Sequence, residues 1–74
     1  MTIKTHNPQL ENIHIEGRRG LWYVIDIVKH LGETCYILEH QTYGDLADHI
    51  VAVYDGMNKF SEVRKQSVID HLLY

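Results

Sequence analysis

A stretch in the middle of the chain carries negative charge and no cation other than histidine. Between His30 and Asn58 there are five carboxylates and not one lysine or arginine. A negative surface of this kind attracts basic surfaces and repels the nucleic acid backbone. The stretch therefore predicts a protein that docks on a basic partner, without direct contact to nucleic acid. The five acids are Glu33, Glu39, Asp45, Asp48 and Asp55.

Six histidines in 74 residues raise the question of a metal site. His40 and His49 flank a connection that holds Asp45 and Asp48, and two imidazoles with a carboxylate can bind zinc. Their spacing matches no compact metal motif, and the other histidines are scattered along the chain. We therefore predict no metal and no cofactor. A metal-binding protein that uses His40 and His49 stays as an alternative.

Residue patterns for catalysis are weak. A small sheet offers little concavity for a substrate pocket, although carboxylates are numerous. Ser61 and Ser67 lack a base and an oxyanion site, and there is no glycine-rich phosphate loop. Trp22 and the five tyrosines lack the positive surroundings that base stacking requires. We expect a non-enzymatic protein whose aromatic residues serve as core or as interface anchors.

The composition indicates one small globular domain. The chain is 45% apolar with a formal net charge of −3, and its basic residues form no patch. Cys35 is the only cysteine, so no internal disulfide can form and a buried core position is expected for it. The first residues do not form a signal peptide, and no apolar run reaches the ~20 residues of a membrane helix. These features predict a cytoplasmic protein.

The order of patterns along the chain predicts an α+β fold. Residues 1–12 are expected to form a loosely held arm, residues 13–56 a sheet and residues 61–73 a helix capped by Ser61. Within the sheet, β-branched and aromatic residues predict strands at 21–31, 34–40 and 49–54. Ile13 and Ile15 add a possible short edge strand. The expected architecture is a meander of three to four antiparallel strands with the C-terminal helix on one face.

Both faces of this sheet are apolar, and one helix can cover only one of them. With a hairpin turn at Gly32-Glu33, one face collects Trp22 and its apolar neighbours on the next strand. That face needs another cover, because an open apolar patch usually marks an interaction surface. Three covers are possible: Ile13 and Ile15 of the leading segment, a second copy in a homodimer, or another protein.

The same register places Asp26 directly opposite Glu39. Like charges that face each other across strands destabilise a sheet. The pair would persist with an arginine bridge, with a bound cation or with one of the two acids protonated. The alternative is a register that differs by one residue.

The run from Gly20 to Gly56 resembles a small domain associated with large polyvalent proteins of bacterial mobile elements. The resemblance covers half the chain, and the C-terminal helix departs from the family pattern. It implies a phage, plasmid or conjugative element in a bacterial host cell, and it carries over no catalytic residues. The matching residues are Gly20, Trp22-x-Val24-Ile25-Asp26, Tyr36-x-Leu38-Glu39-His40, Tyr43-Gly44-Asp45-x-Ala47, Ile50-Val51 and Asp55-Gly56.

In that context a small acidic protein is similar to accessory factors and to inhibitors of host defence, among which anti-CRISPR proteins are prominent. The leading hypothesis is a protein-binding module that docks on a basic surface of a nucleic-acid-handling protein. The alternative is a structural module that self-associates through the Trp22 face. The expected partner-binding residues are Trp22, Asp26, Glu39, Tyr43, Asp45, Asp48 and Asp55.

Overall fold

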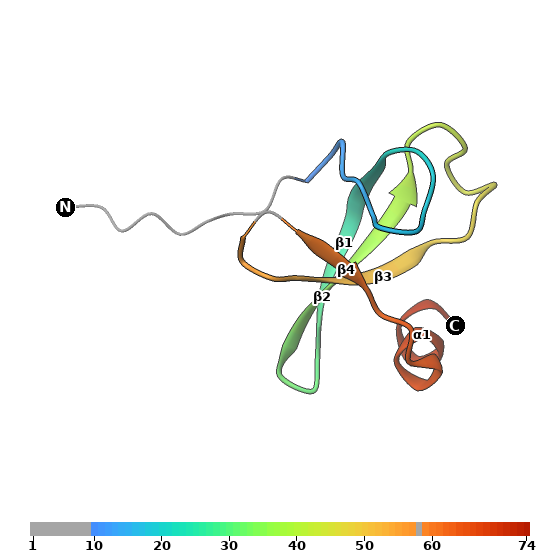
Figure 1. Cartoon of the computed structure of the whole chain (residues 1–74). Helices are drawn as coiled ribbons and strands as arrows, with labels where there is room; N and C mark the ends of the chain where they lie inside the picture. Colours follow the sequence, from blue (N-terminus) through green and yellow to red (C-terminus); the bar gives the residue numbers. More distant parts are fainter. Residues whose placement is uncertain (1–9, 58) are drawn as a thin grey trace.

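The structure is a computed structural model that describes residues 10–57 and 59–74, so the predicted arm lies largely outside the described residues. An antiparallel sheet is followed by one helix (Figure 1). Strands β1 (Trp22–His30), β2 (Glu33–His40), β3 (Ile50–Tyr54) and β4 (Phe60–Glu62) are neighbours in sequence order, and α1 (Gln66–Leu73) packs against β3. The predicted α+β meander with a C-terminal helix is confirmed.

The turn between β1 and β2 consists of Leu31 and Gly32. Both have positive φ, 52° and 82°, and His30 pairs with Glu33. Two positive φ angles are typical of the type I′ turn that matches the twist of a hairpin. The predicted turn at Gly32-Glu33 is wrong by one residue, because the apolar Leu31 leaves the strand and takes a left-handed conformation. Its side chain is almost fully exposed.

A bulge between Val24 and Asp26 shifts the register of β1 against β2. The turn at Leu31-Gly32 places Asp26 opposite Ile37, and the bulge places Tyr23 opposite Glu39, so the predicted pair of facing carboxylates is wrong. The extra residue in β1 changes the partner of every residue that precedes it. The Asp26 carboxylate instead accepts a hydrogen bond from the N–H of Ile27 at 2.9 Å.

The Trp22 face is covered by the chain's own leading segment. Ile13 and Trp22 exchange two backbone hydrogen bonds of 2.8 Å, and Trp22 is only 3% exposed. The structure thus shows the leading segment as the cover of Trp22. Self-association through this face stays a prediction. The cluster on this face consists of Ile13, Ile15, Trp22, Leu38, Ile50, Ala52 and Phe60, with Val24, Tyr36 and Tyr54 packed against it.

The opposite face buries Cys35, Ile37 and Val51. Cys35 is a buried core residue, as expected, and desolvation raises the pKa of its thiol. The helix lies on this side, where the His71 ring contacts the His30 ring at 4.7 Å between centroids.

The helix is shorter than predicted. It begins at Gln66 and not near Ser61, and its N-cap Lys65 makes no side-chain capping bond. Ser61 instead lies in β4 and pairs with Val53 of β3, and Phe60 of β4 is buried against the rings of Tyr36 and Tyr54. Serine before a run of apolar residues is typical of a helix start, which is why the sequence predicted a cap at Ser61. Burial of the neighbouring Phe60 instead favours a strand at this position.

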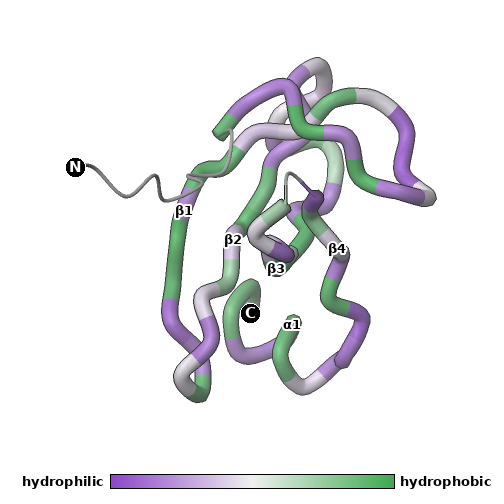
Figure 2. The backbone as a smooth tube through the Cα atoms, turned by 60° about the vertical axis from the view of Figure 1, so that its left-hand side comes forward, coloured by the Kyte–Doolittle hydropathy of each residue, from purple (hydrophilic) through white to green (hydrophobic). Residues whose placement is uncertain are grey.

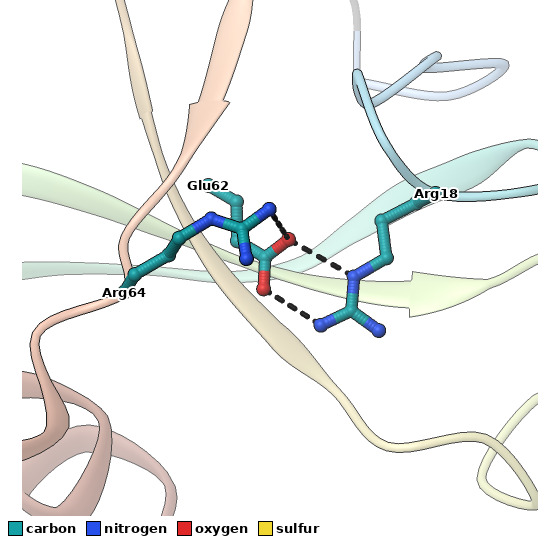
Figure 3. A network of polar contacts seen from close by, with 3 residues as sticks. All are labelled: Arg18, Glu62 and Arg64. Atoms are coloured by element: carbon teal, nitrogen blue, oxygen red, sulfur yellow. Dashed lines mark hydrogen bonds and ion pairs between the residues drawn. The ribbon is translucent and has the colours of Figure 1, made fainter.

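An arginine clasp ties the leading segment to β4. Arg18 donates two hydrogen bonds to the carboxylate of Glu62, of 2.9 and 2.7 Å, and Arg64 approaches the same group at 3.8 Å (Figure 3). The Glu62 side chain is only 9% exposed, so its charge depends on this pairing. The clasp holds the segment that carries Ile13 and Ile15 in place over Trp22.

The domain is expected to lose stability in acid, with Glu62 responsible for part of the loss. The hydrogen bonds from Arg18 hold the pKa of Glu62 below its ordinary value of 4.5. Because the folded pKa is the lower one, the stabilisation is complete above the ordinary value and disappears as the pH falls through the folded value. Glu62→Gln should lower the free energy of unfolding at pH 7 by about 1–2 kcal/mol. The substitution should also make the free energy of unfolding fall less steeply as the pH is lowered from about 5 to about 3.

Urea unfolding at several pH values measures both effects. Glu33→Gln, an exposed change at the β1–β2 turn, is the matched control and should keep the decline of the parent chain. Equal declines in Glu62→Gln and the parent chain would contradict the role of the clasp.

Candidate functional site

The acidic loop, residues 41–49, connects β2 to β3 and begins with a tight turn. The amide of Gly44 donates to the carbonyl of His40 at 2.8 Å, and that of Leu46 donates to Tyr43 at 3.0 Å. Gly44 has φ of 58°, a region that a residue with a side chain seldom adopts. Local backbone bonds therefore give this loop a defined shape at one end of the sheet.

His40 supports the loop from below. Its Nδ1 accepts the amide N–H groups of Thr42 and Tyr43 at 3.1 and 3.2 Å, and the residue is 7% exposed. The ring meets Trp22 edge to face and Tyr43 at a tilt, with centroids 4.9 Å apart in both cases. Because Nδ1 accepts, the neutral ring carries its proton on Nε2. The histidine predicted as an alternative metal ligand is thus a buried support of the loop.

Glu39 stands at the base of the loop in a hydrogen-bonded chain. It accepts from the hydroxyl of Tyr23, and its second oxygen lies 3.0 Å from Nε2 of His49. The Tyr23 hydroxyl first, and His49 second, hold the pKa of Glu39 below its ordinary value, while the same hydrogen bond raises the pKa of Tyr23. The Glu39 side chain is 18% exposed. The Glu39 carboxylate therefore interacts mainly with groups of its own chain, and its contact with His49 fixes the end of the loop.

The outer side of the loop presents apolar and acidic groups together. Tyr43 is 60% and Leu46 is 88% exposed, and Asp45 and Asp48 are exposed beside them. Within the described ranges no ion pair engages either aspartate. Exposed apolar side chains next to free carboxylates are typical of a surface that meets a partner.

The predicted partner-binding residues fall into two groups. Tyr43, Asp45 and Asp48 lie together on the acidic loop, with Glu39 at its base. The other three lie elsewhere and have structural roles. Trp22 is in the core, Asp26 accepts the Ile27 amide on β1, and Asp55 accepts the amides of Met57 and Lys59 at 2.7 and 3.1 Å in the β3–β4 turn.

Sequence reasoning missed Leu46, Tyr23 and His49 as parts of this site. Leu46 had a readable signal, since it is an apolar residue between two acids in an otherwise polar connection. Tyr23 had none, because its contact with Glu39 depends on the register across β1 and β2. His49 was considered only as a metal ligand, and its contact with Glu39 depends on how the loop returns to the sheet. The described part of the chain contains no group of three or more His, Cys, Asp or Glu side chains placed to hold a metal ion. None of its helices is long and apolar enough to cross a membrane.

Comparison with known proteins gives one match. The family model described as large polyvalent protein-associated domain 18 matches residues 5–66, which ends at the first residue of α1. No curated protein and no solved structure matches the chain. Several residues of the family resemblance, among them Gly20, Trp22, His40 and Tyr43, are those that support the acidic loop. The chain belongs to the large polyvalent protein-associated domain 18 family, which links it to the large polyvalent proteins of mobile elements.

Proposed function

We propose that this domain is a non-enzymatic binding module that docks through its acidic loop on a basic surface of another protein. The observation that carries the proposal is the pairing of exposed Tyr43 and Leu46 with the free carboxylates of Asp45 and Asp48. Apolar anchors supply contact area, and the carboxylates steer the approach of a positively charged surface. Because no lysine or arginine lies between His30 and Asn58, nothing in this stretch offsets that charge.

The support beneath the loop favours binding. The hydrogen bonds to His40 and the Glu39–His49 contact hold both ends of the loop. A loop that is ordered before binding loses less conformational entropy when it meets a partner. The same side chains would be of little use to a surface that only keeps the protein in solution.

The partner that best fits this charge is a protein that handles nucleic acid, because such proteins expose basic surfaces for phosphates. Docking there would block access of the nucleic acid. In a mobile element this activity belongs to an inhibitor or accessory factor that acts on a host defence protein such as a CRISPR effector.

Affinity for the partner is expected to depend on salt and on the acidic loop. A pull-down from the native host identifies candidate proteins, and titration calorimetry on the purified pair measures Kd. Raising the salt from 50 to 300 mM should weaken binding by roughly tenfold, because screening removes the attraction between exposed charges. Asp45→Asn/Asp48→Asn should weaken binding to a similar extent and should remove most of the salt dependence.

The matched control is Glu16→Gln/Glu33→Gln, which makes the same change in net charge at exposed positions outside the loop. It should leave the affinity within about twofold, since these charges lie outside the contact. Electrostatic docking would be refuted if Kd changed neither with the salt concentration nor in Asp45→Asn/Asp48→Asn. Equal effects of the two double variants would show that only net charge matters and not this loop.

A further inference from the structure

The helix α1 is incompletely buried. It has four apolar residues on one side, Val68, Ile69, Leu72 and Leu73, and each of them is only half-buried. In Figure 2, apolar and hydrophilic stretches alternate along the short helix, which packs against β3. A helix of eight residues gains most of its stability from packing of its apolar side. The exposed part of this side is therefore available to a further group.

A groove separates α1 from the end of the acidic loop and the start of β3. It consists of two hollows of about 190 and 180 Å³ that share Asp48, His49, Leu73 and Tyr74. The first hollow reaches Asp45 and Ala47, and the second runs on to Ile69 and Glu62. The groove thus joins the outer side of the acidic loop to the apolar side of the helix.

The charges along the groove differ between its two ends. In the second hollow the Arg18 guanidinium lies beside Asp48, and its Nε and one terminal nitrogen donate to Glu62. The first hollow has no lysine or arginine among its lining residues and carries the carboxylates of Asp45 and Asp48. His49, on its wall, is engaged by Glu39. The first hollow therefore combines the carboxylates of Asp45 and Asp48 with the apolar side chain of Leu73, and Arg18 of the second hollow offsets part of the charge of Asp48.

We propose that this first hollow binds one arginine or lysine side chain of the partner. The aliphatic stem of such a side chain packs on apolar surface while its charged end stays near carboxylates, which is the chemistry that the hollow offers. Leu73 would contact the stem, and Asp45 and Asp48 would meet the cation. This inference rests on the proposed function and adds the type of residue that the partner contributes.

Nuclear magnetic resonance tests the proposal with acetylated and amidated hexa-arginine as the probe. Hexa-citrulline is the matched neutral peptide, because citrulline keeps the shape of arginine and lacks its charge. Hexa-arginine should shift the amide signals of Ala47, Asp48 and Leu73 in a saturable way, and hexa-citrulline should not. Leu73→Ala should weaken binding of hexa-arginine by about three- to tenfold, since it removes apolar contact with the stem.

Leu31→Ala is the control for Leu73→Ala, because Leu31 is an equally apolar residue that lies 92% exposed at the β1–β2 turn. It should leave the affinity unchanged, and near-ultraviolet circular dichroism should confirm that both variants are folded. If Leu73→Ala is not folded, Leu73→Val removes a smaller part of the side chain and should weaken hexa-arginine binding in the same direction and to a smaller extent.

Three results would overturn the proposal. The first is an absence of shifts with hexa-arginine, and the second is equal binding of hexa-citrulline. The third is a set of shifts confined to Tyr43 and Leu46 with no effect of Leu73→Ala, which would reject the hollow and leave the docking loop in place. The proposed function itself fails only if the natural partner ignores the loop aspartates, so the two failures are distinguishable.

Discussion

Replacing Trp22 with alanine is expected to leave most of the protein unfolded at 25 °C. The side chain is 3% exposed in a cluster with Ile13, Ile15 and Leu38. Removing a buried tryptophan costs about 3–5 kcal/mol, because apolar burial is lost and a cavity remains. A core of this size rarely supplies more than about 3–5 kcal/mol in total. Far-ultraviolet circular dichroism in increasing urea measures the loss.

Leu46→Ala is the control for Trp22→Ala. Leu46 is 88% exposed, so its truncation should change the free energy of unfolding by less than about 0.5 kcal/mol. Trp22→Phe should fall between the two, since an aromatic ring remains in the core. If Trp22 were instead an anchor at the surface of a dimer, Trp22→Ala would give a folded monomer with an unchanged urea midpoint. That outcome would refute the burial of Trp22 beneath the leading segment.

The elements of the fold follow from local residue patterns. The β-branched and aromatic runs that form β1, β2 and β3 are dense enough to predict these strands to within a residue or two. The segment that covers Trp22 could be predicted only in part from the sequence. The isoleucines at 13 and 15 are equally compatible with a segment that packs on its own sheet and with one that packs on nothing. Local pattern predicts which segments are extended, and it leaves open what lies on them.

The register between β1 and β2 did not follow from the sequence, for two physical reasons. The bulge before Asp26 carries no glycine or other local sign, because an ordinary residue can occupy it. Leu31 has φ of 52°, a left-handed conformation that leucine rarely adopts. The geometry of the hairpin turn requires this conformation. The turn separates Asp26 from Glu39, and the bulge then brings Tyr23 opposite Glu39.

The free charges of the site could be predicted only in part. All five acids between His30 and Asn58 have the same appearance in sequence, but their roles depend on the nearest donor. Asp55 accepts backbone amides in a turn, and Glu39 accepts from Tyr23 and lies beside His49. Asp45 and Asp48 form no ion pair on the described surface, and the Arg18 guanidinium beside Asp48 is hydrogen-bonded to Glu62. Charge in a stretch predicts a type of surface, and hydrogen bonds decide which members form it.

Gly20→Ala is expected to destabilise the domain by about 2–5 kcal/mol and to loosen the acidic loop. Gly20 has φ of 79°, where a side chain costs about 1–2 kcal/mol. An added Cβ would also lie 2.9 Å from Cε1 of His40 and closer still to Nε2. The ring cannot move away freely, because it is buried between Trp22 and Tyr43. Overpacking of this kind adds about 1–3 kcal/mol.

The matched control is Gly56→Ala, which meets the same backbone cost at φ of 84° with no atom within 4 Å of the added Cβ. The difference in unfolding free energy between the two variants therefore isolates the contact with His40. Hydrogen exchange at the amides of Thr42 and Tyr43 reports the loop, and it should accelerate in Gly20→Ala and stay unchanged in Gly56→Ala, since only the former displaces the acceptor Nδ1. Equal destabilisation and equal exchange in both variants would mean that the His40 ring does not depend on Gly20. The order of the loop before binding would then come from its own backbone hydrogen bonds and not from the His40 ring.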